Sequence, residues 1–191
     1  MNRRMSMLCL MLVAAAGMLF ATSAPAEQLP FDIYNHGALV NVGFPSGYPY
    51  FETYTSEQAC PPNSLGITRM AVYVKGDFTT GDVWDGRDVW LTDDGDALFA
   101  RFTGKMWLVP DPVDPVNNPP TVATELHQTF VGGTGLFAGA RGTSTHHCHV
   151  VYDDWPALTN CSNDCHSQGT LILPNLKNKL VPMTAWEGDL V

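Results

Sequence analysis

Residues Phe130 to Gly142 form the most distinctive stretch of the chain and read Phe-Val-Gly-Gly-Thr-Gly-Leu-Phe-Ala-Gly-Ala-Arg-Gly. Glycines stand on both sides of Leu136 and Phe137, and glycine adopts backbone conformations that other residues rarely do. The pattern predicts a sharp turn that buries these two apolar side chains. A glycine-rich phosphate-binding loop is the alternative, but no P-loop lysine follows and no helical pattern begins after the stretch. The residues assigned to the turn are Gly132, Gly133, Thr134, Gly135, Phe137 and Gly139.

Short apolar stretches with period-two alternation occur from Ile67 onwards. Between Leu98 and Leu108 every even position is apolar or glycine, which gives a strand one core-facing side and one wetter side. The same alternation directs Met70, Val72 and Val74 towards the core. A glycine-containing hairpin turn is expected over residues 92–96. No stretch shows a sustained 3.6-residue apolar period, so the fold class is all-β.

The glycine-rich stretch and the hairpin before it resemble a known superfamily of barrel proteins. A strand followed by Gly-Gly-Thr-Gly-x-Phe-Ala-Gly-Ala is typical of bacterial members of the allene oxide cyclase and dirigent-like superfamily, and residues 132–140 follow this pattern. Residues 93–104, Asp-Asp-Gly-Asp-Ala-Leu-Phe-Ala-Arg-Phe-Thr-Gly, are similar to the preceding hairpin of that group. The resemblance covers residues 67–152.

This resemblance implies a closed eight-stranded antiparallel β-barrel in which Leu136 and Phe137 plug one end. Eight strands leave an interior that side chains fill or that holds one small apolar ligand. The superfamily includes cyclases that shape a reactive substrate inside the barrel and dirigent proteins that orient radical coupling. It implies a monomer or a homotrimer. No catalytic residue is transferred, because the matching stretch contains only turn and packing residues.

Three segments are distinguished along the chain. Residues 1–26 resemble a secretory signal peptide, because Arg3 and Arg4 precede an apolar run that ends at Ala24-Pro25-Ala26. Cleavage is expected before Glu27 and makes the protein secreted or periplasmic; a membrane anchor is the alternative. Residues 27–66 are rich in glycine and proline and are expected to form an irregular arm packed on the barrel. Residues 67–191 are expected to form the barrel domain with a disulfide-tied C-terminal extension.

The charge of the chain excludes some classes of partner, and its cysteine content indicates the compartment. The chain has 10 Lys plus Arg against 19 Asp plus Glu and a net charge of -9, which excludes nucleic acids and anionic membrane surfaces as partners. After signal cleavage no membrane association is expected. The remaining four cysteines favour two disulfides in an oxidising compartment, and the three connectivities stay open. These cysteines are Cys60, Cys148, Cys161 and Cys165.

A concentration of histidine and cysteine near the C-terminus provides the metal candidates. His147 and His149 lie two residues apart on one strand face, and His166 follows Cys165. Copper or zinc bound by these three histidines is one interpretation, and disulfides with surface histidines are the other. Cys161 to His166 also resembles a covalent haem-attachment motif, with one residue more than the strict spacing.

Several functions therefore stay open. The leading hypothesis is a protein that binds a small apolar molecule in the barrel interior or mouth and uses no cofactor. A cyclase or isomerase that confines its substrate is the second, and Glu125, His127, Asp82 and Asp88 are its candidate acids and bases. A metal or haem protein and a purely structural or interaction protein are the remaining alternatives.

Overall fold

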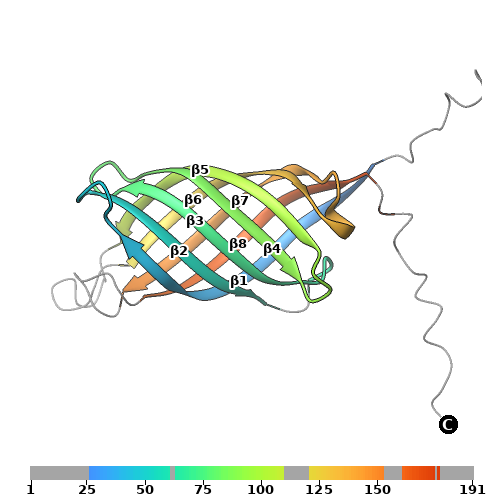
Figure 1. Cartoon of the computed structure of the whole chain (residues 1–191), viewed down its shortest axis with the longest axis horizontal. Helices are drawn as coiled ribbons and strands as arrows, with labels where there is room; N and C mark the ends of the chain where they lie inside the picture. The colour runs from blue at the N-terminus through green and yellow to red at the C-terminus, as the bar shows by residue number, and fades with distance from the viewer. Residues whose placement is uncertain (1–25, 61–62, 110–120, 153–160, 175, 177–191) are drawn as a thin grey trace, which may run out of the picture.

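The computed structural model describes residues 26–60, 63–109, 121–152, 161–174 and 176. Within them, eight β-strands follow one another as antiparallel neighbours, and the first also pairs with the last (Figure 1). One turn of 3₁₀ helix, η1, covers Gly135–Phe137. The strands are β1 (Glu27–Gly43), β2 (Tyr50–Ala59), β3 (Ile67–Asp77), β4 (Asp82–Thr92), β5 (Ala97–Val109), β6 (Thr121–Gly133), β7 (Arg141–Tyr152) and β8 (Cys161–Leu173).

The predicted closed eight-stranded antiparallel barrel is confirmed. Its closure depends on the pairing of β1 with β8, which runs from Glu27 opposite Leu173 to Ala38 opposite Ser162. A closed sheet has no unpaired edge on which another strand can add. Among the described residues, no helix combines the length and the apolar character that crossing a membrane requires. The expected signal peptide lies outside the described residues, apart from Ala26.

The first two strands lie where an irregular arm was expected, and that prediction is wrong. Most of residues 27–66 belongs to β1 and β2, which are full members of the barrel. Phe31 and Ile33 point inwards, but the next inward residue on β1 is Asn35, and β2 directs Glu57 inwards. Such buried polar residues interrupt the apolar alternation by which a strand is recognised. The glycines and prolines mark the turns between strands.

The alternation predicted from the sequence is confirmed in β5 and β3. Leu98, Ala100, Phe102 and Met106 are buried, whereas Leu108 is 52% exposed near the end of β5. In β3, Met70 is buried while Val72 and Val74 are half-buried and pack against the interior clusters. The hairpin turn is also confirmed, because the amide of Thr92 donates to the carbonyl oxygen of Asp96 at 3.0 Å.

The glycine-rich turn joins β6 to β7 at the end of the barrel where β1 begins and β8 ends (Figure 1). Phe137 is completely buried in the core, and Leu136 packs against the same cluster. The Leu136 amide donates to Asp96 Oδ2 at 2.7 Å, which ties the turn to the β4–β5 hairpin. Gly135 has φ +51, and a Cβ atom there would overlap the Asp96 carboxylate. The turn therefore requires glycine at this position.

The barrel interior contains two apolar clusters separated by polar side chains. Along β4, Asp88 lies between Val83 and Trp90, and along β6, Gln128 lies between Leu126 and Phe130. We call the three parts the closed-end cluster, the polar belt and the cavity-end cluster. Their main members are Phe31, Ile33, Trp90, Leu98, Phe130, Phe137 and Leu171; Asn35, Glu57, Asp88, Gln128, His146 and Asn163; and Phe51, Val83, Phe102, Met106, Val122 and Leu126.

Candidate functional site

A cavity of about 90 Å³ lies inside the barrel, between the cavity-end cluster and the polar belt. Most of its lining is apolar, and each of the strands β2 to β8 contributes at least one described residue. For comparison, an engineered apolar cavity of about 150 Å³ binds benzene. The cavity here is smaller than that one, so a guest no larger than a single small ring is expected. The polar residues that line it include Glu57, Asp88, Thr124, Gln128, His146 and Asn163.

Glu57 on β2 places a carboxyl group in this interior. Asn35, Asn163 and Thr55 donate hydrogen bonds to it, the last two at 2.7 and 3.1 Å. Gly37 on β1 leaves the necessary room, because a Cβ atom there would lie 2.6 Å from Glu57 Cγ. Burial raises the pKa of Glu57 above its ordinary value, and the three hydrogen bonds counteract part of this effect.

Asp88 on β4 provides a second interior carboxyl group and is 2% exposed. Gln128 Nε2 donates to Asp88 Oδ2 at 2.5 Å, and Gln128 Oε1 accepts from the Ser144 hydroxyl group. Burial raises the pKa of Asp88 to about 7, and the charge of Glu57 acts in the same direction. Below neutral pH, Asp88 is therefore a neutral acid that is able to donate a proton.

Two polar atoms of cavity-lining residues have no hydrogen-bond partner within the described part of the chain. They are Thr124 Oγ1 and Asn163 Oδ1. A buried polar atom without a partner costs about 1–3 kcal/mol, so such atoms are uncommon unless something else satisfies them. A guest with a hydroxyl or similar donor group would satisfy one or more of them.

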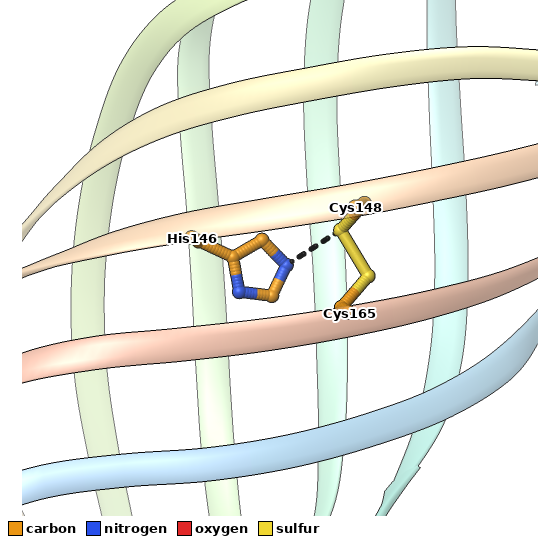
Figure 2. A group of neighbouring side chains, drawn as sticks. All are labelled: His146, Cys148 and Cys165. Carbon is orange, nitrogen blue, oxygen red and sulfur yellow. Dashed lines mark hydrogen bonds between the residues drawn. A yellow bond between two sulfur atoms is a disulfide. The ribbon is translucent and has the colours of Figure 1, made fainter.

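On the inner face of β7 and β8, an imidazole lies against a disulfide (Figure 2). Cys148 and Cys165 occupy directly opposite positions and form the disulfide, and His146 Nε2 lies 2.9 Å from Cys148 Sγ. His146 Nδ1 forms a hydrogen bond with Ser167 Oγ. Burial lowers the pKa of His146 to about 3, and the charge of the neighbouring His147 acts in the same direction, so the buried ring is neutral at ordinary pH.

The three histidines predicted as metal ligands lie on the outer side of the barrel. His147 and His149 are exposed on β7, and His166 lies opposite His147 on β8. His166 Nε2 is 2.6 Å from Asp32 Oδ1, and its ring stacks on Tyr34 with 3.8 Å between centroids. Within the described residues, the potential ligand atoms that come together as a group of three belong instead to His146, Cys148 and Cys165.

The structure forms one of the predicted disulfides, Cys148–Cys165. Cys60 carries a free thiol, which corrects the prediction for this residue: it follows the end of β2 beside Tyr34, with its Sγ 3.4 Å from His36 Nδ1. The side chain of Cys161 lies outside the described residues. Because the Cys165 sulfur is bonded to Cys148, this atom is not available for a haem thioether bond in the structure.

The candidate acids and bases separate into outer and inner groups. Glu125 and His127 form an outer pair with 3.5 Å between Oε1 and Nε2, and Asp82 lies 2.7 Å from the exposed Lys105 ammonium group. Asp88 alone among the four candidates lines the cavity. A bulge in β4 explains why Asp82 and Asp88 differ, because the pairing with β5 shifts between Val83 and Gly86 and breaks the alternation.

Glu57, Gln128, His146 and Asn163 were not identified from the sequence as site residues. The alternating pattern of the sequence could have identified two of them. Gln128 occupies an inward position between Leu126 and Phe130, and His146 lies on the face of β7 opposite the proposed ligands. No sequence pattern identified Glu57 and Asn163. The strand that contains Glu57 was not expected, and the two side chains come together only through strand pairing.

Comparisons of the chain with protein families, with curated proteins and with solved structures find no match. The resemblance of the glycine-rich stretch to the allene oxide cyclase and dirigent-like superfamily therefore stays a prediction.

Proposed function

We propose that this protein is exported and binds, inside its barrel, a small and largely apolar molecule that carries one polar group. The observation that carries the proposal is the interior cavity of about 90 Å³ in which apolar walls meet two buried carboxyl groups. Ligand sites in proteins commonly combine apolar walls with a few polar groups that fix orientation. Closed eight-stranded barrels have an interior that suits one small ligand.

Two polar atoms of the cavity lining indicate the kind of polar group that the ligand carries. Thr124 Oγ1 and Asn163 Oδ1 have no hydrogen-bond partner within the described residues, and both are able to accept a hydrogen bond. A ligand hydroxyl group provides the missing donor without bringing a charge into the interior. Burying a charge there would be costly, because the polar belt contains no cationic side chain to pair with it.

Phenol and benzene test this proposal as a pair, because they share a ring and differ by one hydroxyl group. We expect calorimetric titration to show one phenol bound per barrel, about fivefold tighter than benzene, since a net hydrogen bond contributes about 1 kcal/mol. Leu126→Trp fills the cavity and is expected to abolish binding. Val131→Trp adds the same side chain at an exposed outer position and serves as the control. Binding that survives Leu126→Trp, or no binding of phenol at all, would contradict the proposal.

Export to the periplasm or the medium is supported by the signal-like residues 1–26 and by the Cys148–Cys165 disulfide. β1 begins at Glu27, so cleavage before this residue leaves all eight strands complete. Mass spectrometry of the protein recovered outside the cytoplasm is expected to show an N-terminus at Glu27. Full-length protein that stays in the cytoplasm would refute this part of the proposal.

A cyclase or isomerase is the second candidate, and Asp88 is the observation that favours it. An acid whose pKa is about 7 and that lines an apolar cavity has the properties of a general acid or base at neutral pH. Incubation with the small-molecule fraction of the producing cells is expected to change the retention time of one compound without changing its mass. The conversion is expected to disappear in Asp88→Asn and to persist in Asp82→Asn. A survey that finds no conversion dependent on Asp88 removes this candidate.

A further inference from the structure

We propose that reduction of the Cys148–Cys165 disulfide turns the wall of the barrel interior into a zinc site formed by His146 Nε2 and the two cysteine thiolates. These ligands differ from the outer histidines that the sequence suggested. His146 and Cys148 also line the cavity, but the inference does not rest on the proposed ligand binding, because it concerns a metal ion and the reduced state of the disulfide.

The geometry of the three side chains suits one ion. His146 and Cys148 project from β7, Cys165 projects from β8, and their ligand atoms all lie within 4.8 Å of one another (Figure 2). Zinc bonds of about 2.0–2.3 Å place tetrahedral donor atoms about 3.5–4 Å apart. Cleavage of the S–S bond lets the sulfur atoms separate to such a distance, and small side-chain rotations bring the imidazole to it.

The surroundings provide the hydrogen bonds that metal ligands ordinarily require. Ser167 Oγ bonds to His146 Nδ1, which orients the ring and leaves Nε2 directed at the sulfur atoms. Asn163 Nδ2 lies 3.6 Å from Cys165 Sγ and is positioned to donate to a thiolate there. Both partners are themselves buried, so water does not compete strongly for these contacts.

The charge of the two thiolates favours a divalent metal ion over a monovalent one. Two thiolates and Zn²⁺ sum to zero, whereas Cu⁺ with the same ligands leaves a net negative charge in a buried site that contains no cationic side chain. His146 and Cys148 both line the cavity, so the coordination position that the protein does not fill faces open space. Three protein ligands with one open position is the arrangement of reactive zinc sites, which keep a place for water or a guest.

The redox step needs a dithiol as the reductant. The dithiol transfers two electrons and two protons to the disulfide, which becomes two thiols while the reductant closes to a cyclic disulfide. Zinc then displaces the two thiol protons to solvent. Since the same sulfur atoms serve both states, the disulfide and the zinc site exclude each other.

Zinc stoichiometry in the two redox states tests the inference. The protein is prepared with Cys9, Cys60 and Cys161 replaced by serine, so that Cys148 and Cys165 are its only cysteines. It is reduced with dithiothreitol in urea, because the disulfide is buried, and refolded without reductant under anaerobic conditions in the presence of Zn²⁺. We expect one tightly bound zinc per chain after reduction and none in the oxidised protein. Equal zinc content in both states would overturn the inference.

Substitutions identify the ligands. Ser167→Ala is expected to weaken zinc binding ~10–100-fold, as the loss of an outer-shell partner typically does. His146→Gln is expected to weaken it further, whereas His147→Gln on the exposed outer face is expected to change nothing. Reduced protein in which His146→Gln and His147→Gln bind zinc equally would refute the assignment.

Cobalt provides a readout that does not depend on the variants. Co²⁺ added to the reduced protein is expected to give thiolate-to-metal charge transfer and the intense ligand-field bands of tetrahedral coordination. A weak octahedral spectrum would overturn the inference. If reduction alone unfolds the barrel, zinc is expected to restore the β-sheet circular dichroism spectrum, and failure to restore it would also count against the site.

Discussion

The two ends of the barrel interior are built in different ways. At the closed end, Trp90, Leu98 and Phe137 are completely buried, and the ring of Phe31 meets that of Trp90 edge-on at 5.3 Å between centroids. Towards the other end, apolar walls surround a cavity, and the adjoining polar belt includes two carboxyl groups whose pKa values burial raises. We infer that the closed end contributes most of the stability. The cavity region is less stable than a fully packed core would be, because its residues form a binding site.

The largest effect is expected from Phe137→Ala, which removes the ring at the closed end. Large-to-small substitution of a buried phenylalanine costs about 3–5 kcal/mol. Phe102→Ala is the matched change at the cavity, and we expect it to cost at least about 1 kcal/mol less, because this ring already borders empty space. Urea unfolding measures both. Equal losses, or a larger loss for Phe102→Ala, would remove the distinction between the two ends.

Asp88→Asn is expected to have the next largest effect, and one that depends on pH. The folded chain holds a proton on Asp88 up to about pH 7, whereas the unfolded chain releases it near the ordinary pKa of 3.8. The unfolding free energy of the unaltered protein therefore falls as the pH rises from about 4 to about 7, and asparagine removes this contribution. The difference in unfolding free energy between Asp88→Asn and the unaltered protein is therefore expected to shift by about 2–4 kcal/mol in favour of the variant between pH 4 and pH 8.

Urea unfolding at both pH values measures this gain. Asp94→Asn is the control, because Asp94 is exposed in the β4–β5 turn and its side chain is hydrated in the folded and the unfolded chain alike. A gain that is the same in both variants would show that Asp88 is not the cause.

Gly86→Ala is expected to destabilise the cavity region by about 1–3 kcal/mol through overpacking. A Cβ atom at this position would lie 2.3 Å from the Phe102 ring. The double variant Gly86→Ala with Phe102→Leu is expected to recover part of the loss, since the two residues are in direct contact. Thermal unfolding of the single and double variants measures the coupling, and strictly additive losses would contradict the close packing.

The smallest effect is expected from Thr124→Val, which replaces an unpartnered hydroxyl group with a methyl group of similar size. We expect the empty protein to become up to about 1 kcal/mol more stable and phenol binding to weaken about fivefold. This combination, in which the substitution raises stability and weakens binding, is expected of a residue that serves ligand binding at a cost in stability. Thr129→Val, at an exposed position on the same strand, is expected to leave phenol binding unchanged.

A strand with a uniformly apolar inner face can be recognised from the sequence. β5 presents Leu98, Ala100, Phe102 and Met106 to the interior, so its alternation is evident. In residues 27–66, Asn35 and Glu57 occupy inner positions and hide the pattern of the strands. The polar residues that weakened the strand signal are thus part of the candidate site.

The sequence left open the disulfide partner of Cys148 and the relative positions of Asp82 and Asp88, and strand pairing determines both. Cys148 had several candidate partners, and the β7–β8 register selects Cys165. Asp82 and Asp88 are six residues apart and would share a face in a regular strand, but Asp85 adopts φ +52 within a bulge and separates them. Register and bulges follow from the whole sheet, which local patterns do not describe.

The position of bound phenol shows whether the barrel interior is a binding site. Nuclear Overhauser contacts between phenol ring protons and protein methyl groups can be measured on the oxidised protein. We expect contacts to Val72, Val122 and Leu126, which line the cavity, and their loss in Leu126→Trp. Contacts confined to exposed residues such as Val131 and Val151, or no contacts with any methyl group, would contradict a binding site inside the barrel.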